Sequence, residues 1–168
     1  LVPTIGVGGH CLPKDGILLW WRKHESGADT SASLILLSRI INDESPQKAI
    51  ELAEHKFGKL DGKVVALLGT AYRFDSEDTR NSPTLPLARL LLAKGCKVTL
   101  HDPYVKGDDQ NLERYALTGH FTNDLGAAVG DADYAFFCTG HGVYRDGLDA
   151  ILAKAPKLKG VLDGANLY

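Results

Sequence analysis

The sequence predicts an α/β fold in which a helical segment precedes a Rossmann-like, doubly wound parallel sheet. Two patterns carry this prediction. Before residue 58 the apolar residues recur near a 3.6-residue period, which is typical of amphipathic helices. From residue 63 onward, short apolar runs alternate with helical patterns, as in βαβ units whose strands are buried on both faces. We therefore expect two domains, residues 1–58 and residues 59–168.

The second domain is expected to contain about five strands separated by short helices. We expect strands at 64–68, 98–101, 121, 134–139 and 161–162, and helices at 83–94, 112–117, 125–129 and 148–153. In such sheets, ligands bind beyond the carboxyl ends of the strands. This rule selects four segments as candidate ligand contacts: 69–73, Asp102, 139–141 and 163–165.

The first domain is expected to hold two helices. A short one covers residues 16–26 and ends at Gly27, and a long helical pattern runs from about residue 30 to residue 57. Asp29, Thr30 and Ser31 are candidate N-caps for the long helix. Pro46 should kink or divide it, because proline has no backbone N–H. A helix of this length favours a connector or a dimer spine, so we expect a homodimer through residues 30–57.

Composition limits the class of partner. The chain has 168 residues and a formal net charge of −2, so it offers no broad basic surface for nucleic acid or for an anionic membrane. It contains no run of the ~18 apolar residues that a membrane span needs. Three cysteines far apart in the sequence favour a reducing compartment, and we expect the cytoplasm. A small-molecule or protein partner is the expectation.

The segment GVGGHCLPKD, residues 6–15, is the strongest candidate for a reactive site. It places Cys11 in a glycine-lined turn at the start of an apolar helical run, with Lys14 and Asp15 close behind. A helix N-terminus and a nearby cation both favour a thiolate, which is the nucleophilic form of cysteine. The six histidines lack the spacing of paired metal ligands, so we expect no metal site.

A second candidate lies in the loop after the first predicted strand. Tyr72 and Arg73, with Arg80 further along, are suited to a diphosphate because a guanidinium and helix-start amides both bind phosphate oxygens. The same residues also fit an ordinary βα loop with a solvated acidic run and an internally paired Arg80. Asp102 is placed like a ribose-binding acid or like a simple turn residue. The residues alone leave these alternatives open.

Several motifs, in order along nearly the whole chain, resemble the UDP-glucose/GDP-mannose dehydrogenase superfamily of UDP-sugar 6-dehydrogenases. GVGGHCLPKD resembles the nucleophile motif of that family, and INDESP resembles its central-helix motif. The segment from LLGTAYRF to HDPYV resembles the opening of its nucleotide-sugar domain, and TGHGVYR and VLDGANLY resemble later landmarks. Relatives commonly have arginine where this chain has Ala165, and many have lysine where it has Arg73.

The resemblance implies an NAD-dependent, two-step oxidation of a sugar C6 alcohol to a carboxylate through a cysteine thiohemiacetal and thioester. It implies that Cys11 is the nucleophile, that Asp15 helps to activate water with Lys14 nearby, and that the Cys11–Lys14 backbone and Arg80 lie near NAD. The substrate side is implied for Tyr72 and Arg73 at the UDP moiety and for Val2, Gly6 and Gly8 at the sugar and nucleotide.

The family's NAD-binding domain precedes every motif found here, so we expect this chain to be the C-terminal portion of such an enzyme and to be inactive alone. NAD would then be bound mainly by a domain outside it. The sugar of the UDP-sugar substrate stays open, with features of both the UDP-glucose and the N-acetylmannosamine branches. The alternative is a non-catalytic nucleotide-binding or dimerisation module built on the long helix.

Overall fold

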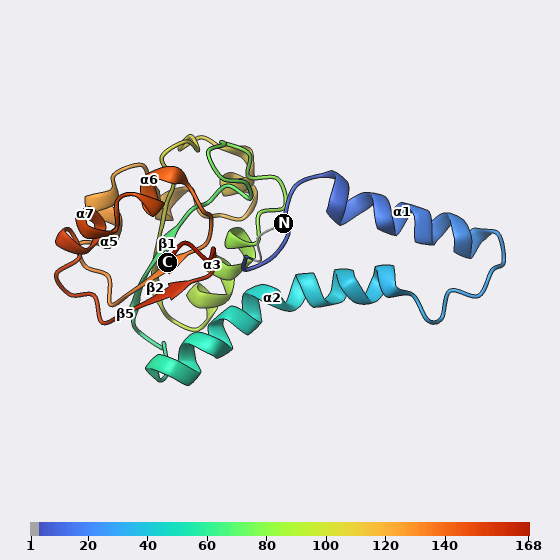
Figure 1. The fold of residues 1–168 in the computed structure, drawn as a ribbon, viewed down its shortest axis with the longest axis horizontal. Helices are drawn as coiled ribbons and strands as arrows, with labels where there is room; N and C mark the ends of the chain where they lie inside the picture. Colours follow the sequence, from blue (N-terminus) through green and yellow to red (C-terminus); the bar gives the residue numbers. More distant parts are fainter. Residues whose placement is uncertain (1–3) are drawn as a thin grey trace.

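The computed structural model describes residues 4–168, and its centre is a five-stranded parallel sheet (Figure 1). The strand order is β3-β2-β1-β4-β5, so the chain starts in the middle of the sheet and winds outward in both directions. The strands are β1 (Val64–Leu68), β2 (Lys97–His101), β3 (Phe121–Thr122), β4 (Tyr134–Phe137) and β5 (Gly160–Asp163). The predicted fold class is therefore confirmed.

Each face of the sheet carries its own apolar core, because alternate side chains of a strand point to opposite faces. On one face, Val65 and Leu67 of β1 pack in a cluster with Ile50, from the helix that leads into the sheet. On the other face, Ala66 and Leu68 pack in a separate cluster. The helices are α3 (Thr84–Ala93), α4 (Gln110–Arg114), α5 (Leu125–Val129), α6 (Gly142–Arg145) and α7 (Leu148–Ala153), with a 3₁₀ turn η1 (Thr118–His120). Residues of α3 and α4 join the first cluster and residues of α5, α6 and α7 the second.

Residues 11–57 form a helical hairpin that projects away from the sheet (Figure 1). It consists of α1 (Cys11–Glu25) and α2 (Leu34–Phe57). The last turns of α2 belong to the sheet domain, since Ile50 and Ala53 are fully buried in its core. The first half of α2 and all of α1 extend beyond it. The hairpin thus places the start of α1 beside the sheet and its tip far from it.

Two details of the hairpin differ from expectation. The first helix begins at Cys11, five residues earlier than predicted, with Pro13 in its first turn, where a missing N–H costs no intrahelical hydrogen bond. The long helix is capped by Ser33, whose side chain accepts from the amide of Leu36, and not by Asp29, Thr30 or Ser31. Of the two effects expected of Pro46, the helix shows the bend and not the division: α2 continues through Pro46, and Figure 1 shows the bend.

The strand C-termini converge at one edge of the sheet, as the fold class requires. The loop after β1 crosses this edge, where the amide of Gly69 donates to the carbonyl of His101 at 2.9 Å. Gly69 has φ +101°, and a Cβ there would lie 2.5 Å from the Cβ of Thr139. Thr139 in turn donates its hydroxyl to the carbonyl of Ala71 at 2.5 Å. The ends of β1, β2 and β4 are thereby packed into one unit beneath the loops.

Within residues 4–168, the helices are all too short or too polar to cross a membrane.

Candidate functional site

Cys11 is the first residue of α1, and its side chain is exposed. The loop before it, residues 6–10, is held against α2 by Asn42. The side chain of Asn42 accepts from the amide of Val7 at 2.6 Å and donates to the carbonyl of Val7 at 3.1 Å. Because one amide side chain binds both backbone groups of Val7, the position of the loop relative to α2 is fixed. The sequence placed Asn42 in the INDESP motif but gave no sign of this contact.

The same loop is attached to the loop after β1. The amide of Gly9 donates to the carbonyl of Arg80 at 2.8 Å, and the side chain of Asn81 donates to the carbonyl of Gly9 at 2.8 Å. A Cβ on Gly8 would lie 2.5 Å from the Cβ of Tyr72, and one on Gly9 would lie 2.9 Å from the end of its ring. Only glycine permits this approach. The cysteine loop and the Tyr72 loop, which are about 60 residues apart in sequence, therefore form one surface.

Charged side chains surround the thiol. The carboxylate of Asp15 lies 2.6 Å from the ammonium of Lys14 and raises the pKa of Lys14. Asp78 contacts the guanidinium of Arg80 at 2.6 Å and raises the pKa of Arg80. Cys11 adds a smaller contribution to both increases, so the sulfur lies within electrostatic range of the two cations.

The expected internal pairing of Arg80 is present, but it leaves Arg80 on the surface. Its side chain is 58% exposed while it contacts Asp78. Arg73 is also exposed, and its guanidinium lies 6.0 Å from the centre of the exposed Phe74 ring. Tyr72 is half-buried, and its amide donates to the carbonyl of Asp78 at 3.0 Å, which closes the loop. Two arginines and a tyrosine are thus presented from one closed loop.

The remaining predicted site residues lie in the loop before α1, in α1 itself and after β5. Gly6 and Gly8 lie in the loop of residues 6–10. A Cβ on Gly6 would lie 2.9 Å from the Cβ of Pro83, and Gly8 is buried under Tyr72. Lys14 and Asp15 lie in the first two turns of α1. Val2 lies outside the described residues. Ala165 is 5% exposed.

Asp102 is an internal residue and does not face a ligand. Its carboxylate is fully buried and accepts five hydrogen bonds: from the amides of Thr70, Ala71, Tyr104 and Val105 and from the ring of His141. Burial alone would raise its pKa, but the hydrogen bond from His141 and those from the amides outweigh burial and lower the pKa. The reading of Asp102 as a ribose-binding acid is therefore wrong, because both oxygens are already engaged.

The acidic run of the loop is not simply solvated. Asp75 accepts from the amide of Gly142 at 2.9 Å and from the hydroxyl of Tyr104 at 3.2 Å, and its own amide donates to His141 at 2.9 Å. Sequence reasoning selected 139–141 from the strand end but gave His141 no partner. The signal that was available is its position four residues after the end of a buried strand.

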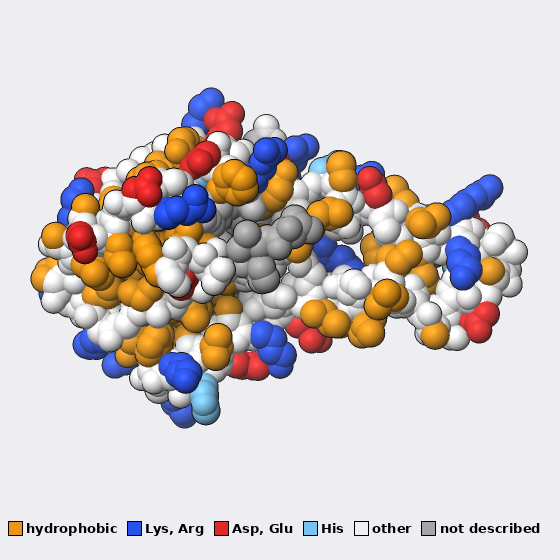
Figure 2. All heavy atoms as spheres, viewed as in Figure 1, with side chains coloured by type: hydrophobic (Ala, Val, Ile, Leu, Met, Phe, Trp, Pro, Cys, Tyr) orange, Lys and Arg blue, Asp and Glu red, His pale blue; other side chains and the backbone are white. Residues whose placement is uncertain are grey.

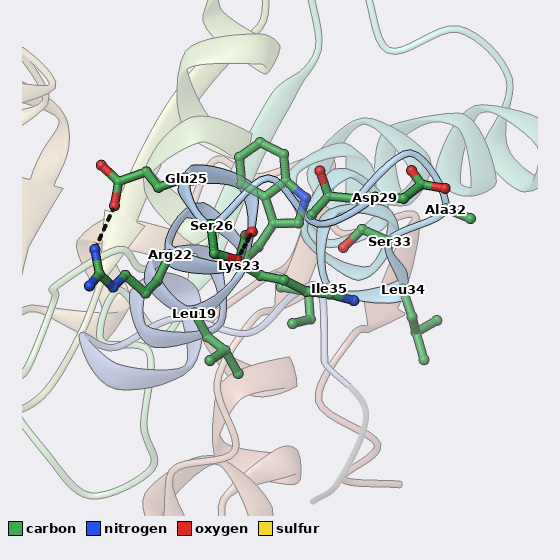
Figure 3. A pocket seen from close by; sticks show the side chains of 12 residues that line it. Leu19, Arg22, Lys23, Glu25, Ser26, Asp29, Ala32, Ser33, Leu34 and Ile35 are labelled. Carbon is green, nitrogen blue, oxygen red and sulfur yellow. Dashed lines mark hydrogen bonds and ion pairs between the residues drawn. The ribbon is translucent and has the colours of Figure 1, made fainter.

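Two hollows lie on the hairpin. One of about 360 Å³ adjoins the cysteine loop and is lined by Val7, Leu12, Pro13 and Asn42, with part of α2. A larger one of about 800 Å³ lies at the hairpin tip, lined by the last turns of α1 and the following loop (Figure 3). The tip hollow lies at the far end of the hairpin from Cys11, beside an Arg22–Glu25 ion pair, and takes no part in the candidate site. Residues 4–168 bring together no group of three metal-ligating side chains.

Comparison with known proteins decides the family. Residues 66–168 match the model described as UDP-glucose/GDP-mannose dehydrogenase family, UDP binding domain. The chain belongs to the UDP-glucose/GDP-mannose dehydrogenase family.

Among members of this dehydrogenase family, the UDP-N-acetyl-D-mannosamine dehydrogenase of Pyrococcus horikoshii is 33% identical over 98% of this chain and 36% of its own length. The GDP-mannose 6-dehydrogenase of Azotobacter vinelandii is 36% identical over 78% of this chain and 30% of its own. A crystal structure of NDP-N-acetyl-D-galactosaminuronic acid dehydrogenase from Methanosarcina mazei superimposes with a TM-score of 0.85 at 31% identity, covering all of this chain and 36% of that one. The chain thus spans about a third of the length of the relatives it matches.

Replacing Asp102 by asparagine should destabilise this member of the family. The Asp102→Asn variant keeps one acceptor oxygen but turns an NH₂ group toward donors, and we expect a loss of about 3 kcal/mol in the free energy of unfolding at pH 7. Because the folded-state pKa lies below the usual 3.8, the difference from wild type should be fully present above pH 3.8 and shrink as the pH falls through the folded-state pKa. Urea denaturation across this range measures both effects.

The control is Asp108→Asn, at an exposed acid on the loop after β2, which should leave the free energy of unfolding within about 0.5 kcal/mol of wild type. Equal stability of Asp102→Asn and Asp108→Asn at pH 7 would contradict the buried role of Asp102.

Proposed function

We propose that this chain supplies the nucleophile loop and the nucleotide-sugar-binding domain of an NAD-dependent nucleotide-sugar 6-dehydrogenase. The observation that carries the proposal is the attachment of the Cys11 loop to the Tyr72–Arg80 loop by the Gly9 and Asn81 hydrogen bonds. This reaction needs a reactive thiol close to a diphosphate-binding loop. Here a thiol at a helix N-terminus lies beside a cationic loop suited to a diphosphate. Membership of the dehydrogenase family supports the assignment.

In the proposed reaction, Cys11 attacks the C6 aldehyde that the first oxidation leaves, and its sulfur forms a bond to that carbon. The resulting thiohemiacetal loses the hydride from C6 and the proton from its hydroxyl, and becomes a thioester. Water then attacks the thioester carbon, the carbon–sulfur bond breaks, and the carboxylate and the free thiolate are the products. Asp15 orients the water and takes its proton, and Lys14, paired with Asp15 at 2.6 Å, offsets negative charge as it forms.

NAD, when bound, supplies the acceptor for the two hydrides. The sheet described here does not fit that cofactor, since Gly69 is packed against Thr139 and Asp102 is buried and fully bonded. We therefore propose that NAD is bound mainly by a part of the protein outside this chain. From this chain, exposed Arg80 and the Cys11–Lys14 backbone would border the cofactor.

We propose that residues 59–168 hold the UDP end of the substrate. Arg73 would bind the diphosphate as a two-pronged donor, and Tyr72 would pack against the nucleotide from its place over Gly8 and Gly9. Val2, Gly6 and Gly8 would border the sugar. The binding unit must include the end of α2, because Ile50 and Ala53 complete its core. The cytoplasm is the proposed location, since a reactive thiol needs a reducing compartment.

The first half of α2 is the proposed homodimer contact. Large apolar side chains on it are exposed, and Figure 2 shows such groups spread over the hairpin. Leu37 is 53% exposed and Ile41 is 58% exposed, and the four-residue spacing places them on one face of the helix. An apolar helix face of this kind is stabilised by a second copy that covers it.

The Arg73→Ala variant tests the nucleotide site. Removal of a charge-assisted phosphate contact should weaken UDP binding about tenfold to a hundredfold, as measured by isothermal titration calorimetry of the 168-residue chain. Arg89→Ala, at an exposed arginine of α3, is the matched control and should keep wild-type affinity. Absence of UDP binding by the wild-type chain, or equal affinity of both variants, would count against the site.

The Cys11→Ser variant of the complete gene product tests the nucleophile. We expect substrate-dependent NADH formation coupled to release of the sugar acid in the wild type, and no release of acid by the variant. Cys96→Ser, at a buried cysteine whose sulfur contacts the carbonyl of Leu60, should keep acid formation. A wild-type protein that forms no NADH with any nucleotide sugar would favour the non-catalytic binding module.

Charging the exposed face of α2 tests the dimer. We expect the double variant Leu37→Lys/Ile41→Lys to sediment as a monomer at concentrations where the wild type is a dimer, because two buried cations cannot be desolvated cheaply. Leu152→Lys, on α7 with 43% exposure, should leave the sedimentation unchanged. A wild type that stays monomeric at all concentrations would refute the proposed contact.

A further inference from the structure

The loop that carries Tyr72 and Arg73 is fastened at both of its ends. At its start, the amides of Thr70 and Ala71 donate to one oxygen of Asp102 at 2.8 and 2.9 Å. At its far end, the amide of Asp75 donates to Nδ1 of His141 at 2.9 Å. The two proposed substrate residues lie between these anchors. Asp102 and His141, which accept these hydrogen bonds, therefore also influence the direction in which Tyr72 and Arg73 project from the loop.

The far anchor holds a backbone conformation that most residues avoid. Asp75 has φ +51°, in the left-handed region where aspartate is tolerated and most side chains are strained. Its amide bond to His141 and its carboxylate bonds to Gly142 and Tyr104 hold this conformation. The strain is therefore maintained by a specific set of partners from β4–α6 and from the loop after β2.

The hydrogen bonds of His141 define its tautomer. Nδ1 accepts an N–H, so it carries a lone pair. Nε2 lies 3.0 Å from an oxygen of Asp102, which can only accept, so Nε2 carries the proton. The side chain is fully buried, and the rings of Tyr104 and Tyr144 pack on it with centroids 5.1 and 5.4 Å away. The imidazole is neutral, and its orientation is fixed.

His141 thus joins the two anchors through one ring. Asp102 binds the start of the loop directly and binds the end of the loop through His141. A shift of the imidazole would release the Asp75 amide and remove one of the five donors of Asp102, whereas Thr70 and Ala71 reach that carboxylate directly. The conformation of residues 73–75 therefore depends on this ring more directly than that of residues 69–72, because the amide of Tyr72 is also held by the carbonyl of Asp78.

We propose that His141 is a positioning residue for nucleotide binding. Its neutral, Nε2-protonated ring holds the amide of Asp75 and thereby sets the positions of Tyr72 and Arg73. The proposal rests on the proposed diphosphate role of those two residues, and it assigns to His141 no contact with the substrate.

The first test reads the tautomer and the anchor without any ligand. In the ¹⁵N-labelled 168-residue chain at neutral pH, the His141 nitrogens should give the shifts of an unprotonated Nδ1 and a protonated Nε2. In the His141→Phe variant, hydrogen exchange of the Asp75 amide should rise at least about tenfold, while the core amides of Leu67 and Phe136 stay protected. A protonated Nδ1, or unchanged exchange at Asp75, would overturn the proposal.

The second test measures UDP affinity by calorimetry. We expect His141→Phe to bind UDP about fivefold to tenfold more weakly, and His141→Gln, which keeps a donor for Asp102 and an acceptor for Asp75, to recover most of that loss. His55→Gln, at an exposed histidine of α2, is the control and should bind as wild type does. Wild-type affinity in a folded His141→Phe variant would overturn the positioning role.

A surface variant covers the case in which His141→Phe fails to fold. Asp75→Ala removes a side chain that is 49% exposed and disfavours φ +51°, so the fold should survive while UDP affinity falls severalfold. Asp75→Asn, which tolerates this φ, should bind more tightly than Asp75→Ala, and equal wild-type affinity for both would overturn the proposal. If the wild-type chain binds no UDP, the proposed function fails, while the tautomer and exchange results still decide whether His141 anchors Asp75.

Discussion

The buried carboxylate of Asp102 is the interaction on which the candidate site depends. An ionised carboxylate with no exposed surface is tolerated only when donors replace its water. Here four amides and one imidazole do so, and they come from the ends of β1, β2 and β4. If one strand end moved away, a donor would be lost and the buried charge would be left unsatisfied. The carboxylate therefore fixes the positions of the three strand ends relative to one another. The loops that carry the proposed substrate residues start from that arrangement.

A second, more exposed set of contacts joins the loop that carries Cys11 to these strand ends. Asn42 fixes the glycine loop to α2, and Asn81 with the carbonyl of Arg80 fixes it to the loop after β1. These are neutral hydrogen bonds near water, so each contributes only about 1 kcal/mol. Close packing of Tyr72 on Gly8 and Gly9 adds to them. The cysteine loop is thus held by several weak contacts, whereas the strand ends beneath it are held by one strongly satisfied charge.

The sequence predicted the sheet well because burial on both faces forces continuous apolar runs, as in 64–68 and 134–139. Local signals also identified Cys11, Tyr72 and Arg80 as candidates. They placed Cys11 at the start of an apolar helical run but began the helix itself at residue 16, whereas α1 begins at Cys11 and holds Pro13 in its first turn. Nor could they pair Asp75 with His141, which lies 66 residues away and becomes a neighbour only when β1 and β4 align. Such contacts depend on sheet order.

The sheet and the projecting hairpin differ in how their apolar surface is covered. Both faces of the sheet are closed by the chain's own helices, so the sheet domain has a complete core. Helix α1 contributes no buried residue, and Leu18, Leu19 and Trp21 on it are more than half exposed. Hydrophobic burial is the main favourable term in folding, so the projecting hairpin gains little stability from this chain alone. The position of Cys11 at the base of the hairpin therefore depends on the hydrogen bonds that join its loop to α2 and to the loop after β1.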